Sequence, residues 1–349
     1  MSPTQVNAQV NNSDEVDLTT SYLGLSLRTP VVASAGPLTQ SLDSMKALED
    51  AGVGAVVMYS LFEEQVRYEE EQRVSVVEAH ANSFAEALSY FPTEPSSTNG
   101  ETAQYLGLLE QGAKALDVPL IASLNGTRVG GWTATAKRLQ DAGAAAIELN
   151  TYFLPGDFSA SGAEVEQRHL DLLQAVKSAV DIPVAIKLSP YFSSFGSLAS
   201  RLDAAGADGL VLFNRFLQPD IDVNRQEVVS GFELSNPEEG RLPRTWIAAL
   251  RGKVDASLAA SSGVEGYRDV VKGVLAGADV VMTTSALVRH GASHAADLVK
   301  GLRDYLSREQ LTLEAARGML AVPKSASVTD YERSGYVSAL EKAKRRYGV

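Results

Sequence analysis

The segment QDAGAAAIELN, from Gln140 to Asn150, carries the pattern that decides the fold of this chain. A helical stretch ends at Gly143, and an apolar run follows it. Glycine just past a helix caps it, because glycine alone adopts positive φ without a Cβ clash. An apolar run that does not alternate with polar residues indicates a strand buried on both faces, as in a parallel sheet covered by helices.

The same phrase occurs three more times, as EDAGVGAVVM from Glu49, DAAGADGLVL from Asp203 and VLAGADVVMT from Val274. Counting every such run gives eight predicted strands, at residues 31–34, 55–59, 120–124, 146–150, 184–188, 209–213, 257–261 and 279–283. Helices are predicted between most of them, for example at 41–50, 133–142, 165–179, 194–205 and 266–276. Eight such units are typical of an α/β (β/α)8 TIM barrel, and a doubly wound sheet is the structural alternative.

Five stretches lie outside this repeat. Residues 1–17 are polar and predict a flexible tail, and a hairpin around Gly24 is expected to close the barrel floor before the first strand. Two insertions, at about 61–105 and 214–243, follow barrel strands, so we expect both over the carboxyl face. The barrel itself is predicted to span 18–306, and 307–349 predict a helical extension packed on it.

The composition narrows the class of partner. The 349 residues include 31 basic and 43 acidic side chains, and the net charge of −12 disfavours nucleic acid and anionic membranes because like charges repel. The chain has no cysteine, which excludes disulfides, thiolate metal sites and cysteine nucleophiles. There is no membrane-spanning apolar stretch and no signal-peptide pattern, so a soluble cytoplasmic protein is expected.

Polar residues at the ends of the predicted strands indicate the chemistry, because barrel active sites lie at the carboxyl ends of strands. Asn125, Asn150 and Asn214 each end an apolar run, and Lys187 does so in VAIKLSP. No acidic residue or histidine does, which excludes a two-carboxylate glycosidase and a His/Asp metal hydrolase, and no metal is expected. Asparagine donates and accepts hydrogen bonds, so these residues suit a planar heterocycle.

Lys187 is the most specific candidate for a functional residue, since an ammonium inside a barrel is costly unless it is paired. It suits a Schiff-base nucleophile or a fixed cation beside a ring that gains negative charge, and a snorkelling lysine is the structural alternative. A Schiff-base aldolase also needs an acid or base partner, which no predicted strand end supplies. The turns SSGV at 261–264 and TTSAL at 283–287 occupy the place where barrels bind phosphate, after the last two strands.

Five motifs occur in the same order as in the dihydroorotate dehydrogenase family, which the chain resembles from about Leu18 to Arg303. They are ASAGP at 33–37, IELN at 147–150, PVAIKLSPYF at 183–192, LFN at 212–214, and SSGV with LAGADVVMTTSAL between 261 and 287. The resemblance implies a barrel with one FMN at its carboxyl face, which oxidises a C–C bond of dihydroorotate to give orotate in pyrimidine biosynthesis.

The resemblance also implies roles for single residues. Ser34, Ala35 and Gly36 would line the flavin ring, and Lys187 would lie near its N1/O2 edge, where a cation stabilises the reduced flavin. Gly263, Thr284 and Ser285 would hold the phosphate. Further flavin contacts are expected from Ser60, Asn125, Asn150 and Ser262, and substrate contacts from Asn82, Asn150, Asn214, Arg215 and Tyr59.

The chain departs from the family around the substrate. After IELN the family has a Cys or Ser that removes a proton, and here Phe153 stands at that position, with Pro155 in place of the family's next asparagine. Tyr59 replaces a lysine that helps to hold the substrate carboxylate, and Arg215 replaces a serine. Tyr152 then becomes the catalytic candidate beside Lys187, with Thr151 or water as alternatives for proton transfer.

Three interpretations stay open. The chain is an FMN enzyme with a related substrate, or it oxidises dihydroorotate with a displaced base and with Arg215 as the carboxylate clamp. In the third, it is a flavin-binding electron-transfer or non-catalytic subunit that has lost this oxidation. The resemblance implies a homodimer, and without a membrane helix a soluble electron acceptor is expected.

Overall fold

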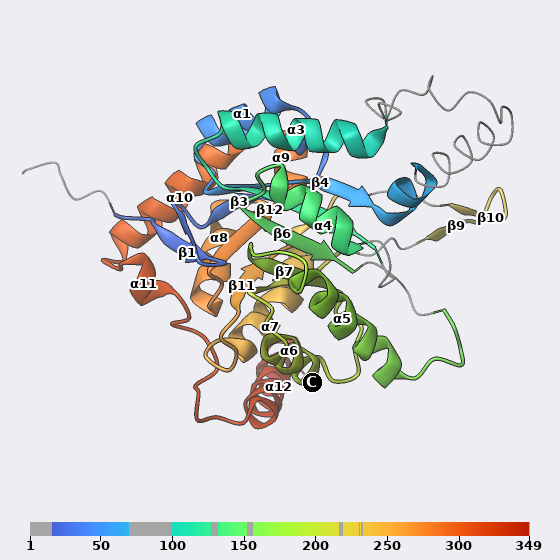
Figure 1. Cartoon of the computed structure of the whole chain (residues 1–349). Helices are drawn as coiled ribbons and strands as arrows, with labels where there is room; N and C mark the ends of the chain where they lie inside the picture. The colour runs from blue at the N-terminus through green and yellow to red at the C-terminus, as the bar shows by residue number, and fades with distance from the viewer. Residues whose placement is uncertain are drawn as a thin grey trace, which may run out of the picture.

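A computed structural model of the chain describes residues 16–69, 100–126, 132–151, 156–215, 219–229, 231 and 233–348. Parallel strands close into a barrel in the order β11-β12-β3-β4-β5-β6-β7-β8 (Figure 1). Their bounds are β3 Val31–Ala33, β4 Ala55–Phe62, β5 Leu120–Asn125, β6 Ala146–Asn150, β7 Val184–Leu188, β8 Gly209–Leu212, β11 Ser257–Ala260 and β12 Val280–Thr283. The predicted TIM barrel is therefore confirmed, and the doubly wound alternative is wrong.

Helices connect the strands and cover the outside of the barrel (Figure 1). They are α1 Leu42–Asp50, α3 Glu101–Ala115, α4 Trp132–Asp141, α5 Gly162–Lys177, α6 Phe195–Ala204, α7 Arg241–Leu250, α8 Tyr267–Ala276, α9 Ser285–His290 and α10 His294–Arg308, with the short 3-10 helix η1 Pro37–Thr39. The glycines of the repeated phrase, Gly52, Gly143, Gly206 and Gly277, have φ values from 92° to 119°. This left-handed conformation ends each helix where the sequence predicts it.

The floor of the barrel, at the amino ends of the strands, is closed by the predicted hairpin of β1 Thr20–Tyr22 and β2 Leu25–Leu27. Small residues inside the barrel, such as Ala55 and Ala185, leave room for Tyr22 and Leu23, which pack among them. A Cβ at Gly209 would lie 2.4 Å from Leu23 Cδ2, so glycine is needed there. Because the hairpin fills the floor, the carboxyl ends of the strands form the open end of the barrel.

The second insertion contains an antiparallel hairpin of β9 Asp220–Asp222 and β10 Glu227–Val229, followed by the 3-10 helix η2 Pro237–Gly240. In the first insertion, β4 continues to Phe62, three residues beyond the prediction, and residues 63–69 are helical. Residues 70–99 of this insertion lie outside the described part of the chain.

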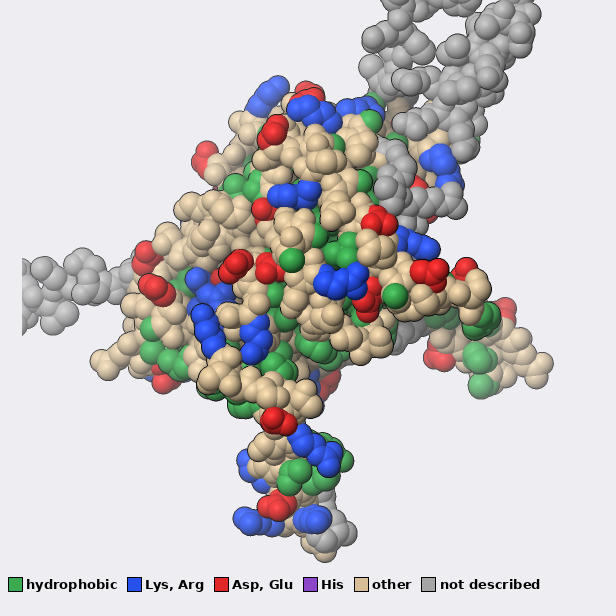
Figure 2. Space-filling model, turned by 60° about the horizontal axis from the view of Figure 1, so that its bottom comes forward, with side chains coloured by type: hydrophobic (Ala, Val, Ile, Leu, Met, Phe, Trp, Pro, Cys, Tyr) green, Lys and Arg blue, Asp and Glu red, His purple; other side chains and the backbone are tan. Residues whose placement is uncertain are grey.

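The two helices of the C-terminal extension differ in how they contact the barrel. α11 Leu313–Ala316 buries Leu313 and Ala316. α12 Val328–Tyr347, which was also expected to pack, has no buried residue among those described, and it projects from the body of the molecule (Figure 2).

Candidate active site

A cavity of about 660 Å³ lies at the carboxyl ends of the barrel strands. Cavities of roughly 300–1,000 Å³ hold small-molecule ligands and cofactors. All the residues predicted to contact the cofactor line it: Ser34, Ala35, Gly36, Ser60, Asn125, Asn150, Lys187, Ser262, Gly263, Thr284 and Ser285. Asn214 and Arg215, predicted for the substrate, line it too.

Lys187 lies in this cavity beside a carboxylate that the sequence prediction missed. Its Nζ is 3.4 Å from Oε1 of Glu148, and the two side chains are 9% and 1% exposed. Glu148 precedes Asn150 by two residues on β6, so both side chains point into the barrel. Glu148 supplies the partner that a buried ammonium requires. The sequence signal was present, because Glu148 interrupts an apolar run in phase with Asn150.

The three asparagines predicted to act together lie close to one another. Asn214 Nδ2 donates to Asn150 Oδ1 at 2.6 Å, and Asn125 is paired with Asn150 in the register of β5 and β6. Asn125 and Asn150 are each 8% exposed, so their remaining donors and acceptors are shielded from bulk water. Such amides can read the alternating N–H and C=O groups of a heterocycle.

The ends of β11 and β12 form a cradle of hydroxyl and backbone N–H groups. Ser262 and Gly263 have φ values of 73° and 68°, and a Cβ at Gly263 would lie 2.2 Å from the backbone nitrogen of Gly240. Ser285 Oγ accepts from the backbone N–H and the hydroxyl of Ser235, both at 3.0 Å, and the Gly263 N–H donates to Ser235 Oγ at 3.3 Å. Ser235 comes from the second insertion, where no sequence signal distinguishes it from other turn residues.

Thr284 links this cradle to the end of the first barrel strand. Its Oγ1 donates to the backbone carbonyl oxygens of Ser34 at 2.9 Å and Ala35 at 3.2 Å. A Cβ at Gly36 would lie 2.3 Å from Thr284 Cγ2. The close approach therefore requires a glycine in ASAGP and holds this backbone in the cavity wall.

A bulge in β4 decides which of its side chains reaches the cavity. Val57 pairs with Ile121 and Ser60 with Ser123, so β4 has one residue more than β5 over this span. A bulge redirects the side chains that follow it. Ser60 therefore points inward, with its Oγ 2.9 Å from Ser123 Oγ, whereas Tyr59 packs edge-to-face on Tyr105 with ring centroids 4.9 Å apart. Tyr59 does not line the cavity, contrary to its expected place at the substrate.

Tyr105, on α3, occupies the position where the bulge breaks the β ladder. The backbone N–H of Ser123 donates to its hydroxyl at 2.9 Å, and the hydroxyl donates to the carbonyl oxygen of Ser123 at 3.4 Å. Burial raises the pKa of Tyr105, so the hydroxyl stays protonated and can donate. The tyrosine thus satisfies backbone groups that β4 leaves unpaired at the bulge.

Two other candidates already have protein partners. Arg215 Nε lies 2.9 Å from Glu239 Oε2, and its Nη1 donates to the carbonyl oxygen of Glu233, so the guanidinium anchors the second insertion beside the cavity. Thr151 is buried outside the cavity lining, and its Oγ1 donates to the carbonyl oxygen of Lys187 at 3.2 Å. This geometry offers neither a free carboxylate clamp at Arg215 nor a proton acceptor at Thr151.

Asn82, predicted for the substrate, Tyr152, the catalytic candidate, and Phe153, at the family's base position, lie outside the described residues. Within the described ranges, no group of three or more His, Asp and Glu side chains could hold a metal ion. No helix in those ranges is long and apolar enough to cross a membrane.

A family profile described as dihydroorotate dehydrogenase matches residues 17–306, which include the whole barrel and all the residues that line the cavity at its carboxyl end. The chain belongs to the dihydroorotate dehydrogenase family. The predicted family is confirmed, and membership supports an oxidoreductase. The matched range ends within α10, so α11 and α12 lie beyond the part shared with the family.

Individual relatives in the dihydroorotate dehydrogenase family match over most of their length. The putative dihydroorotate dehydrogenase A (fumarate) of Aeropyrum pernix is 29% identical over 297 residues, which is 83% of this chain and 92% of the relative. The catalytic subunit of dihydroorotate dehydrogenase B (NAD(+)) from Methanocella arvoryzae is 26% identical over 85% of this chain and 95% of its own length. The corresponding subunit from Listeria welshimeri is 28% identical over 74% of this chain and 83% of its own length.

Proposed function

We propose that this chain is an FMN-dependent oxidoreductase that transfers hydride between a C–C bond of a small planar heterocycle, dihydroorotate or a relative of it, and the flavin. The observation that carries the proposal is the buried Lys187, which faces the cavity from a strand end and is paired with Glu148. A cation at this place stabilises negative charge that develops on a bound ring.

The residues of the cavity fit FMN at both ends. Gly263, Thr284 and Ser285, with Ser235 beside them, line the end suited to a phosphate, and the Ser285 hydroxyl, which accepts from Ser235, has its own proton left to donate. The Ser34–Gly36 backbone and Ser60 line the part of the cavity that would take the ring. A Cβ at Gly36 or Gly263 would strike its neighbours, so these two glycines are required by the shape of the wall.

FMN, when bound, supplies the acceptor for a hydride. The chain itself fixes a positive charge at Lys187, and the carboxylate of Glu148 holds that charge in place. The bonded pair Asn150 and Asn214 would orient the substrate through its amide-like edges, and the low exposure of Asn125 and Asn150 limits the access of water. These are positioning and electrostatic contributions, which need fixed geometry in a shielded site.

Proton transfer is the part of the chemistry in which this chain differs from its family. Phe153 cannot accept a proton, and Thr151 is hydrogen-bonded outside the cavity. We assign this role to Tyr152 or to water. We include in the proposal the homodimer, the soluble electron acceptor and the cytoplasmic location that the sequence suggests.

The proposal is tested by an anaerobic flavin-reduction screen. The purified protein is expected to be yellow and to release FMN on denaturation, and a colourless protein that takes up no added FMN would contradict the cofactor. Dihydroorotate is expected to bleach the flavin slowly or not at all, because the usual base is missing. Rapid bleaching by dihydroorotate would show that this is the substrate and that Phe153 is bypassed.

A panel of related dihydropyrimidines then separates the remaining possibilities. Bleaching by one of them identifies an enzyme with a changed substrate. A flavin that no member of the panel reduces, but that dithionite does reduce, favours a flavin-binding subunit that has lost the oxidation.

A further inference from the structure

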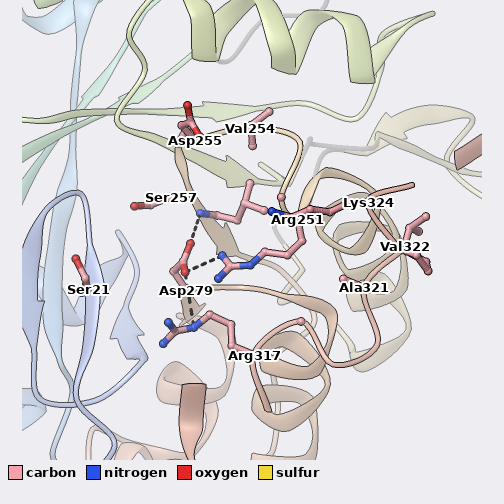
Figure 3. A pocket seen from close by; sticks show the side chains of 15 residues that line it. Ser21, Arg251, Val254, Asp255, Ser257, Asp279, Arg317, Ala321, Val322 and Lys324 are labelled. Carbon is pink, nitrogen blue, oxygen red and sulfur yellow. Dashed lines mark hydrogen bonds and ion pairs between the residues drawn. The ribbon is translucent and has the colours of Figure 1, made fainter. Parts of the chain in front are cut away.

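A second cavity, of about 600 Å³, lies at the floor of the barrel, at the end opposite the candidate active site (Figure 3). Its lining comes from the floor hairpin, the loop after α7, the starts of β11 and β12, and the segment after α11. The floor hairpin, the region around β11 and the segment after α11 come from distant parts of the sequence. Nothing in the proposed flavin chemistry uses this cavity.

The lining carries more basic than acidic side chains, although the chain as a whole has a net charge of −12. Arg251, Arg317 and Lys324 face two carboxylates, Asp255 and Asp279. Asp279 lies between the two guanidinium groups, whereas Asp255 lies away from them (Figure 3). The two guanidinium groups therefore share the carboxylate of Asp279.

That carboxylate has little accepting capacity left. Asp279 Oδ1 lies 2.9 Å from Arg251 Nη1 and 3.6 Å from Arg317 Nε, and Oδ2 accepts the backbone N–H of Leu258 at 2.8 Å. Arg317 also donates to Thr20 Oγ1 at 2.6 Å. Because a guanidinium carries five N–H donors, each arginine retains donors that can serve a ligand in the cavity.

The electrostatics of Arg317 favour an additional anion. Burial lowers the pKa of Arg317, Asp279 raises it, the neighbouring Arg251 lowers it again, and Glu314 raises it. A negative charge in the cavity would relieve the repulsion between the two guanidinium groups. It would also pair with Lys324, which is exposed and has no ion pair among the described residues.

Glycines leave room for the basic side chains around the cavity, because a side chain at these positions would approach them closely. A Cβ at Gly277 would lie 2.8 Å from Arg251 Cγ, and one at Gly252 would lie 2.4 Å from Lys324 Cε. Both glycines have positive φ, so substitution is doubly disfavoured. The backbone at Lys324 is held as well, because Lys253 Nζ donates to its carbonyl oxygen at 3.4 Å.

We propose that the floor cavity binds a small phosphate-bearing anion between Arg251, Arg317 and Lys324. Guanidinium groups match the oxygens of a phosphate through paired N–H bonds, and the ammonium adds a point charge. The lining has three basic and two acidic side chains, so an anion supplies negative charge that the cavity lacks, and a phosphate offers more oxygens to the three cations than a carboxylate does. The bound anion would bridge the loop after α7 to the C-terminal extension.

The test uses inorganic phosphate as the probe and FMN-saturated protein, so that the phosphate cradle at the other end of the barrel is filled. Isothermal titration at constant ionic strength is expected to show saturable binding, and acetate is expected not to bind. Lys324→Ala should weaken phosphate binding by roughly two- to fivefold, the range for an exposed ion pair. Arg317→Gln should weaken it by more than about tenfold, since a charge-assisted guanidinium bond is lost.

Lys300→Ala, an exposed lysine on α10 that is paired with Asp304, is the matched control and should leave phosphate binding unchanged. If Arg317→Gln does not fold, Lys324→Ala still decides, because the Lys324 side chain takes no part in the ion pairs of Asp279 and its removal leaves them intact. Each of three results would overturn the proposal. They are no phosphate binding by the wild type, phosphate binding as tight in both cavity variants as in the wild type, and acetate binding as tight as phosphate binding.

Discussion

The two cavities at opposite ends of the barrel are similar in size, about 660 and 600 Å³, but their charges are arranged differently. At the carboxyl end, one ammonium and one carboxylate are paired at 9% and 1% exposure. At the floor, Arg251 and Arg317 are 32% and 16% exposed and share Asp279. Charges that are shielded from water act strongly on a neighbouring group, whereas partly solvated charges are screened. The shielded pair at the carboxyl end suits catalysis, and the partly solvated cluster at the floor suits ligand binding and contacts between distant segments.

The largest effect is expected from breaking the buried pair at the carboxyl end. Lys187→Met or Glu148→Gln alone should lower the free energy of unfolding by about 3–5 kcal/mol, because each substitution leaves the other member of the pair as a buried charge without its partner. The double variant should recover most of this stability but should bind FMN weakly or resist its reduction. Urea unfolding and flavin titration measure the two effects separately. A Lys187→Met protein with wild-type stability and wild-type reduction would show that the lysine has neither role.

A smaller effect is expected at the phosphate cradle, and the floor hairpin provides its control. Gly263→Ala and Gly24→Ala both place a Cβ at positive φ, at 68° and 76°, which costs about 1–2 kcal/mol. Only Gly263 would also meet backbone, 2.2 Å from the Gly240 nitrogen, whereas nothing lies within 4 Å of the Gly24 position. Gly263→Ala should therefore be the less stable variant by thermal unfolding and should lose FMN affinity. Equal losses in both variants would mean that the cradle tolerates a side chain.

The smallest effect is expected where α3 supports the bulge of β4. Tyr105→Phe removes the hydroxyl that serves both backbone groups of Ser123, and the expected cost is about 1 kcal/mol in urea unfolding. Tyr59→Phe is the matched control, because the Tyr59 ring packs against Tyr105 but its hydroxyl makes no hydrogen bond among the described residues. A Tyr59→Phe variant that is less stable than Tyr105→Phe would contradict the assigned role of the bulge.

The barrel could be predicted because its signals are local. A glycine cap followed by an apolar run identifies four of the strands, and the φ values at Gly52, Gly143, Gly206 and Gly277 agree with the prediction. The strand-end residues Lys187, Asn150 and Asn214 were found for the same reason, since a strand end can be located from the run that precedes it.

The remaining features depend on contacts between distant segments. The bulge that replaces Tyr59 with Ser60 at the cavity is a mismatch between β4 and β5, which neither strand reveals alone. Glu148 could be recognised as the partner of Lys187 only once β6 and β7 were placed side by side. The pairing of Arg215 with Glu239 similarly requires the path of the second insertion.

The hydrogen bond from Arg317 to Thr20 joins residues 297 positions apart in the chain. During synthesis at about 5–20 residues per second, Arg317 is made roughly 15–60 s after Thr20. The floor hairpin therefore leaves the ribosome early and packs against strands that are still being completed, without its final anchor. The anchor arrives with the segment after α11, so a late stretch of the chain fastens an early one.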